Sequence, residues 1–194
     1  MEAQDLTEPY KKARTEGRMH VFIDESGFFH SPSRKPHCCR SWAPHGQTPV
    51  LAFNFNWWKL SVSAGLTLRN FYFRLDPGAI RQAEVIDFLK ALVRHIDQPL
   101  LIVWDRVPAH RSRLVREFIE LSEEHIVTEY LPPYAPELNP VEYIWACWKQ
   151  HELPNVCPKD CGELSRCARR ALRRMQRKPR LITAFWKQSS LCVG

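Results

Sequence analysis

The fold is decided by the stretch LLIVWD, residues 100–105, in which five consecutive apolar residues end at an aspartate. A run this short, with Pro99 before it and Asp105 after it, favours a strand over a helix. Because all five side chains are apolar, the strand is expected to be buried on both faces, paired on both sides in the centre of a helix-covered sheet. The segment therefore predicts an α/β protein.

The chain before this strand shows four strand-like runs, which make three strands if the last run extends its predecessor, and one helix. Apolar and aromatic residues recur in the strand-like runs at 20–29, 48–57, 60–68 and 70–75, of which the last can extend or pair with its predecessor. Asp76 and Pro77 have the residue types of an N-cap and a first helical position, so a helix is predicted from there to Ile96.

The chain after the central strand alternates helices with a further strand. The pattern predicts helices at 111–121 and from Asn139 onward, a strand at 125–130, and a last helix at 162–178 that Pro179 ends, after which residues 181–186 pack back on the body. This order of elements predicts a mixed sheet of about five strands flanked by helices.

Single acids stand at three particular places in this order. Asp24 lies in the first strand, Asp105 follows the central strand, and Glu142 begins the helix after the last strand. Parallel strands present their carboxyl ends on one edge of a sheet, where ligands gather. Three carboxylates held together repel one another, and oxygen-only ligation favours Mg²⁺ or Mn²⁺. Two such ions, roughly 4 Å apart, can cleave a phosphodiester.

The approach to Glu142, LPPYAPELNPVEYIW at 131–145, holds four prolines. One interpretation is structural: Asn139 as N-cap and Glu142 three residues later form a capping box. The other is that a rigid backbone holds Glu142 as a metal ligand. The two roles are not exclusive.

Positive charge is concentrated near the C-terminus. Between Cys161 and Gly194 there are nine Lys or Arg and one acid, which gives this region a formal charge of +8. The rest of the chain has a formal charge of −1, and the sum is the net +7. A polyanion partner or a solvated helix face would both explain it. The candidate DNA contacts in this region are Arg169, Arg170, Arg173, Arg174 and Arg177.

Seven cysteines without a signal sequence are expected to be reduced thiols. A zinc set of His151, Cys157, Cys161 and Cys167 is disfavoured because it lacks a CxxC pair, and His37 with Cys38 and Cys39 is disfavoured too. No apolar run approaches the ~18 residues of a membrane span. We therefore expect a cytoplasmic protein that does not enter membranes.

Three blocks resemble the catalytic motifs of the mariner-like DDE superfamily transposases, and most closely those of the bacterial insertion-sequence branch. They are FIDESG at 22–27, VWDRVPAHRS at 103–112 and LPPYAPELNPVEYIW at 131–145. The 36 residues between Asp105 and Glu142 match the spacing typical of that group. The resemblance extends over about 19–150.

The resemblance implies a ribonuclease-H-like fold and a DNA transposase catalytic domain. Asp24, Asp105 and Glu142 would be the catalytic triad and would bind two Mg²⁺ ions, for which Mn²⁺ can substitute. The implied reactions are cleavage at the ends of an element, with water as nucleophile, and strand transfer into target DNA by a 3′-hydroxyl, without a covalent enzyme–DNA intermediate. Double-stranded DNA, a homodimer on that DNA, and a bacterial, nucleoid-associated location are implied with them.

The chain also departs from the family. Arg106 stands where Asn is common in the family. Arg106 could bind a phosphate, or it could mark an inactive copy. His110 is a second candidate phosphate contact. The sequence before Asp24 is too short for an end-reading helix-turn-helix, so we expect either a truncated element or the second reading frame of a split gene, in which a separate product of the upstream frame would supply the helix-turn-helix. The expected division is a polar lead-in at 1–18, the catalytic domain at 19–155 and a basic helical extension at 156–194. Two alternatives stay open: an inactive DNA-binding remnant, and a ribonuclease-H-like nuclease with other nucleic-acid substrates.

Overall fold

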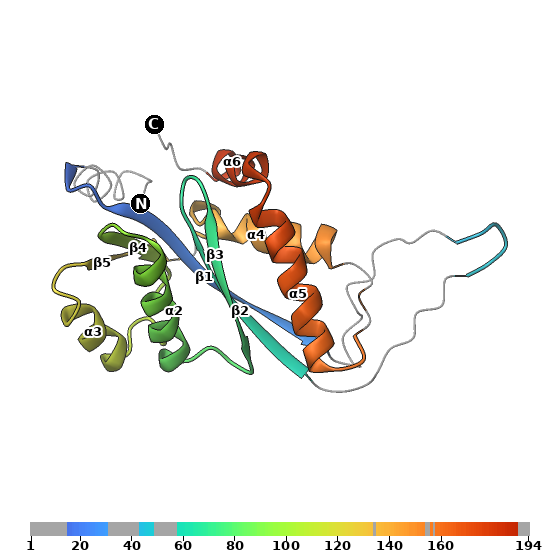
Figure 1. Cartoon of the computed structure of the whole chain (residues 1–194), viewed down its shortest axis with the longest axis horizontal. Coiled ribbons are helices and arrows are strands. Elements are labelled where there is room, and N and C mark those ends of the chain that lie inside the picture. Colours follow the sequence, from blue (N-terminus) through green and yellow to red (C-terminus); the bar gives the residue numbers. More distant parts are fainter. Residues whose placement is uncertain are drawn as a thin grey trace.

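Five strands form one mixed sheet in the computed structural model (Figure 1), which describes residues 15–30, 43–48, 58–133, 135–153, 156 and 158–189. The order across the sheet is β3-β2-β1-β4-β5, and β1 is parallel to β4 and β4 to β5, whereas β2 is antiparallel to both of its neighbours. The strands are β1 (Met19–His30), β2 (Trp58–Leu66), β3 (Phe71–Pro77), β4 (Leu100–Trp104) and β5 (Ile126–Tyr130). The predicted mixed sheet is confirmed.

Strand β4 is the buried strand that the sequence predicts. All five of its residues are buried, because helices cover both faces of the sheet and β1 and β5 pair along its two edges. The register sets Phe22 of β1 beside Val103, and Trp104 beside Tyr130. The chain leaves β4 directly into Asp105, at the same end of the sheet toward which β1 runs.

The helices divide between the two faces of the sheet (Figure 1). One face packs against α2 (Gln82–His95) and α3 (Arg113–Glu120), and the other against α4 (Val141–Cys147), α5 (Cys161–Gln176) and α6 (Pro179–Gln188). A 3₁₀ turn, Pro136–Leu138, precedes α4, and a π-helical turn, Trp148–Glu152, follows it.

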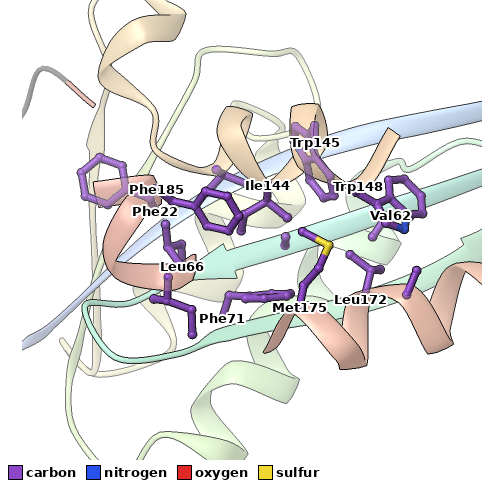
Figure 2. Close-up of a cluster of buried hydrophobic side chains, with 14 of the residues drawn as sticks. Phe22, Val62, Leu66, Phe71, Ile144, Trp145, Trp148, Leu172, Met175 and Phe185 are labelled. Atoms are coloured by element: carbon purple, nitrogen blue, oxygen red, sulfur yellow. The ribbon is translucent and has the colours of Figure 1, made fainter. Parts of the chain in front are cut away.

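Alternation along β1 sends successive side chains to opposite faces. Val21 and Ile23 belong to the core beside α2 and α3, whereas Phe22 belongs to the core beside α4, α5 and α6. Figure 2 shows this second core, in which side chains of β1, β2 and β3 meet those of the three helices. By the same alternation Asp24 projects toward α4 and Glu25 toward α3.

The predicted start of the first helix is wrong. Asp76 lies in β3 opposite Ser61, is only 6% exposed, and accepts from the Arg74 guanidinium at 2.9 Å. Proline is tolerated there because β3 is an edge strand of the sheet. Helix α2 instead begins after Arg81, whose backbone N–H donates to the Glu84 carboxylate at 2.9 Å.

The C-terminal helices belong to the core beside β2 and β3. Asp160 caps α5 by accepting from the backbone N–H of Glu163 at 2.6 Å. Helix α5 ends at Gln176, two residues before the predicted end, and Pro179 is the first residue of α6. Residues 181–186 pack back as predicted: the Trp186 indole donates to the Thr67 carbonyl at 2.9 Å and its ring meets Phe22 edge-on at 5.3 Å.

Some expectations fall on residues that the structure does not describe: the lead-in over 1–14, the loop over 31–42 and most of the strand predicted at 48–57. Among the described residues no helix has the length and apolar character needed to span a membrane. The domain boundary predicted at residue 155 stays a prediction.

Truncation of Leu172 tests whether α5 is part of the folding unit. Leu172 is fully buried in α5 (0% exposed), so Leu172→Ala is expected to lower the free energy of unfolding by about 2–5 kcal/mol. The matched control is Leu114→Ala on α3, where Leu114 is 44% exposed and a change within about 0.5 kcal/mol is expected. Urea unfolding followed by circular dichroism measures both, and equal effects would contradict the packing of α5.

Candidate active site

Three acids from separate elements lie at the end of the sheet where β4 stops. Asp24 stands in β1 opposite Ala64, Asp105 follows β4, and Glu142 lies in the first turn of α4. Loss of solvent raises the pKa of both Asp24 and Glu142, and repulsion adds to it, from Glu142 on Asp24 and from Asp105 on Glu142. The structure therefore places Glu142 within electrostatic interaction distance of both predicted aspartates.

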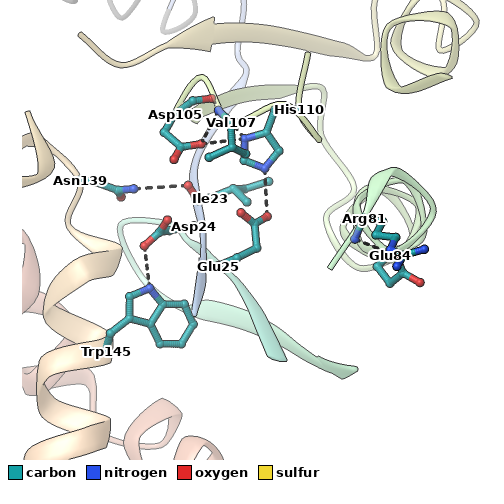
Figure 3. A network of polar contacts seen from close by, with 10 residues as sticks. All are labelled: Ile23, Asp24, Glu25, Arg81, Glu84, Asp105, Val107, His110, Asn139 and Trp145. Atoms are coloured by element: carbon teal, nitrogen blue, oxygen red, sulfur yellow. Dashed lines mark hydrogen bonds and ion pairs between the residues drawn. The ribbon is translucent and has the colours of Figure 1, made fainter. Parts of the chain in front are cut away.

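Asp24 is the most buried of the three carboxylates. Burial, followed by repulsion from Glu142, raises the pKa of Asp24 to about 8, against an opposing hydrogen bond from Trp145. The Trp145 indole N–H donates to Oδ2 of Asp24 at 2.7 Å, so the carboxylate has a fixed position (Figure 3). An acid kept in this state would gain from a cation that neutralises it.

Asp105 is held by a histidine and a backbone amide (Figure 3). Burial alone would raise its pKa, but a hydrogen bond from His110, the Val107 amide and the His110 charge together lower it. Nδ1 of His110 lies 3.0 Å from Oδ1 of Asp105, and the Val107 N–H donates to the same oxygen at 3.3 Å. Asp105 is therefore an ionised, oriented carboxylate, and its side chain is 44% exposed.

His110 needs a correction as a predicted DNA contact. Its side chain has 0% exposed surface, so it offers nothing to a phosphate. Burial would lower its pKa, but hydrogen bonds to Asp105 and Glu25, together with the Glu25 charge, raise it to about 10. The ring stacks on Trp104 at 4.3 Å between centroids. His110 is therefore an internal cation between two acids.

Glu142 does not form the predicted capping box. The backbone N–H of Asn139, which Glu142 would have to reach, donates instead to the carbonyl of Pro136 at 2.9 Å. The Asn139 side chain accepts from the Val141 N–H at 3.2 Å and donates to the Ile23 carbonyl at 3.4 Å, beside Asp24. Asn139 thus fastens the start of α4 to β1, and the Glu142 carboxylate plays no part in the cap.

One face of α4 and of the π-helical turn follows β1. Glu142, Trp145 and Lys149 are three and then four residues apart, which places them on one helical face. Lys149 donates to the Ser26 hydroxyl at 2.6 Å. Partial desolvation is the largest influence on Glu142, although this residue is exposed, and together with repulsion from Asp105 it raises the pKa of Glu142 against the lowering effect of the Lys149 charge. Helical spacing counted from Glu142 would have singled out Trp145 and Lys149, which the sequence analysis missed.

The donor set fits a hard divalent cation. Asp24, Asp105 and Glu142 supply only carboxylate oxygens, the ligand type that Mg²⁺ and Mn²⁺ prefer. Within the described ranges no three His, Cys, Asp or Glu side chains are gathered tightly enough to hold an ion as they stand. Bound ions would therefore have to draw the three carboxylates together. Cys157 of the disfavoured zinc set lies outside the described residues.

The predicted arginines are exposed but differ in their partners. The Arg106 guanidinium lies over the Tyr130 ring, 5.7 Å from its centroid. Arg174 donates to the Glu152 carboxylate at 2.6 Å, and Lys178 reaches the other oxygen of Glu152 at 3.5 Å. The remaining arginines of the predicted set lie on the exposed face of α5 and at its end: Arg169, Arg170, Arg173 and Arg177.

The chain is similar to known proteins in family and in fold. Residues 19–165 match the family model described as DDE superfamily endonuclease. No curated protein matches the chain. Among solved structures, the mariner Mos1 paired end complex with Mg is 22% identical, with a TM-score of 0.66 over 98% of this chain and 58% of that one.

Two further Mos1 structures show the same likeness. The Mos1 strand transfer complex is 19% identical, with a TM-score of 0.66 over 95% of this chain and 55% of that one. The catalytic domain of Mos1 mariner transposase is 19% identical, with a TM-score of 0.59 over 95% of this chain and 81% of that one. These similarities confirm the ribonuclease-H-like fold. The chain spans somewhat more than half the length of the Mos1 chains in the complexes.

Replacing Asp24 tests its unfavourable burial. Because the pKa of about 8 in the folded chain exceeds the ordinary 3.8, the folded state holds the proton more tightly. The contribution of this carboxyl to stability is full below pH ~3.8 and is lost as the pH rises through ~8. In metal-free buffer, Asp24→Asn is therefore expected to gain stability relative to the native chain between about pH 5 and about pH 8.5.

Thermal unfolding in EDTA across that pH range measures the difference between the two proteins. Asp97→Asn, at an exposed position after α2, is the control and should follow the native chain. A difference between Asp24→Asn and the native chain that does not change with pH would contradict the burial of a charged Asp24.

Proposed function

The chain belongs to the DDE superfamily endonuclease family, and from this we propose that it is a DNA transposase catalytic domain that uses Asp24, Asp105 and Glu142 as metal ligands. One observation supports this assignment above the others. Glu142 of α4 is close enough to Asp24 of β1 and to Asp105 after β4 for repulsion with each of them, and Asp24 is buried. A divalent cation would relieve this arrangement, and the carboxylate donor set fits one.

In the proposed reaction, two Mg²⁺ ions, or Mn²⁺ in their place, would supply activation of the attacking oxygen and stabilisation of the leaving oxygen. Water first attacks phosphorus at an element end, the P–O3′ bond breaks, and a 3′-hydroxyl is released. That hydroxyl then attacks a phosphodiester of the target DNA, so one bond forms as another breaks.

The chain's own residues would hold the acids in place during these steps. Trp145 fixes Asp24 through its indole N–H, and Asn139 ties α4 to β1. Exposed arginines of α5 would bind the DNA backbone, because arginine pairs with phosphate through several N–H donors at once. Arg106, exposed beside Asp105, would contact a phosphate nearer the reaction.

The proposed partner is double-stranded DNA. The solved Mos1 relatives include a paired end complex and a strand transfer complex, and we extend this to a homodimer of the present chain on DNA ends. A helix-turn-helix protein from an upstream frame would read those ends. The proposal includes a bacterial insertion-sequence origin and a nucleoid-associated location.

Metal-dependent nicking tests the triad. With Mg²⁺ the purified chain is expected to nick supercoiled DNA, and EDTA should abolish this activity. Asp105→Asn should slow nicking by at least about a hundredfold, because it removes the charge of a metal ligand. The control Asp87→Asn changes an acid on α2 that pairs with Arg74 and should keep native activity.

Equal nicking by the native chain and Asp105→Asn would exclude the three-acid mechanism. A native chain that binds DNA but never nicks it would favour the inactive remnant, for which Arg106 in place of the usual Asn is the motivating departure. Faster cleavage of RNA–DNA hybrids or branched substrates than of duplex DNA would favour a different ribonuclease-H-like nuclease.

Salt dependence tests the arginines of α5. Replacing Arg169, Arg170 and Arg173 with Ala should weaken DNA binding and reduce the slope of log K against log salt by about 0.9 for each lost phosphate contact. Arg113→Ala is the matched control, because this α3 arginine pairs with Glu117 at 3.3 Å and lies across the sheet from α5. Arg174→Ala should change the slope less than Arg173→Ala, because Glu152 already engages Arg174. An unchanged slope in the triple variant would contradict this role.

A further inference from the structure

Glu25 and His110 form a polar pair that the triad does not account for (Figure 3). Nε2 of His110 lies 3.0 Å from Oε1 of Glu25, and Nδ1 lies 3.0 Å from Oδ1 of Asp105. Nδ1 also lies 3.2 Å from the backbone carbonyl of Asp105. The two nitrogens of a fully buried ring are therefore engaged by two acids, one in β1 and one directly after β4.

The pair connects the two strands that present the aspartates. Glu25 is the residue after Asp24 in β1 and projects to the opposite face, toward α3, whereas Asp105 follows β4. The Trp104 indole stacks on the imidazole with an angle of 10° between the planes. With both edges bonded and one face covered, the ring has a single orientation, and that orientation is set jointly by β1 and β4.

The two carboxylate oxygens of Asp105 differ in their hydrogen bonds. Oδ1 is near Nδ1 of His110 and also accepts from the Val107 N–H. Across the described ranges no hydrogen bond reaches Oδ2, so that oxygen stays available to a cation. Hydrogen bonds of this kind, from residues behind a metal ligand, fix its orientation and commonly change metal affinity by about 10–100-fold.

We propose that Glu25 and His110 are positioning residues, which hold Asp105 through Oδ1 so that Oδ2 is presented to a divalent metal ion. The inference rests on the metal-binding role proposed above for Asp105. Glu25 holds Nε2 of the ring in place, and the ring in turn holds the Asp105 carboxylate through Nδ1. Neither residue touches the ion or the DNA.

Two substitutions of His110 separate positioning from simple packing. An asparagine amide nitrogen takes the place of Nδ1 and can still donate to Asp105, whereas a glutamine amide nitrogen takes the place of Nε2 and can only reach Glu25. Packing favours the opposite order, because asparagine leaves the larger cavity in this buried site. The order of metal affinity therefore distinguishes the two roles.

The experiment measures Mn²⁺ binding to the full chain without DNA, by the electron paramagnetic resonance signal of free Mn²⁺, beside thermal unfolding in EDTA. His110→Gln is expected to weaken Mn²⁺ binding by at least about tenfold, and His110→Asn by no more than about threefold. Glu25→Gln, at a side chain that is 19% exposed, keeps the size of the side chain and removes only its charge, so it leaves no cavity. It is expected to weaken Mn²⁺ binding several-fold, and it tests the positioning role if the His110 variants do not fold.

Asp105→Asn and the control Asp87→Asn complete the set. Loss of Mn²⁺ binding in Asp105→Asn, with native affinity in Glu25→Gln and His110→Gln, would overturn the positioning role and leave the proposed metal site intact. Native Mn²⁺ affinity in Asp105→Asn would refute the metal role of Asp105, and the inference that rests on it. Affinity that follows thermal stability, with His110→Asn the weakest, would assign the pair to packing alone.

Discussion

The position of Glu142, which is repelled by Asp105 and itself repels Asp24, is the constraint on which the rest of this end of the molecule depends. Burial and a neighbouring acid raise the pKa of Asp24 to about 8. The charged form of this carboxyl is therefore less stable in the folded chain than it would be in water. Each surrounding contact keeps one acid from turning away: Trp145 for Asp24, His110 for Asp105, and Asn139 for the helix that carries Glu142. The fold therefore holds these acids in place although the surroundings of Asp24 disfavour its charge.

The two cores hold these contacts in register. Alternation along β1 directs Asp24 to the face of α4 and Glu25 to the face of α3, so adjacent residues serve opposite layers of the protein. Strand β4, apolar on both sides, is the fixed reference between them. A functional side chain needs a position accurate to about 0.5 Å, and strands packed on both faces provide it better than a loop does.

Much of this architecture could be predicted from local sequence signals. The apolar run at 100–104 predicted the central strand, and Asp24, Asp105 and Glu142 lie in the elements that the sequence predicted for them, within β1, after β4 and at the start of α4. The errors arose where tertiary contacts override local preference. Asp76 and Pro77 have the residue types of a helix start, but pairing with β2 and the Arg74 ion pair keep them in a strand. Asn139 and Glu142 fit a capping box, but Pro136 already accepts the N–H concerned.

Contacts between distant residues were beyond any local pattern. Nothing near His110 in the sequence shows that Glu25, which is 85 residues away, engages its second nitrogen, or that its ring is sealed from solvent. The exposed arginines of α5 were predictable from composition, but the engagement of Arg174 by Glu152 was not, since it depends on how the π-helical turn meets α5.

The contribution of α6 to the core also bears on biosynthesis. Ile182, Phe185 and Trp186 complete the apolar cluster around Phe22, although they lie some 160 residues downstream of it. While a ribosome still holds these residues in its exit tunnel, that face of the nascent sheet stays open to water and to other chains. The apolar cluster around Phe22 can therefore close only after α6 has emerged from the ribosome.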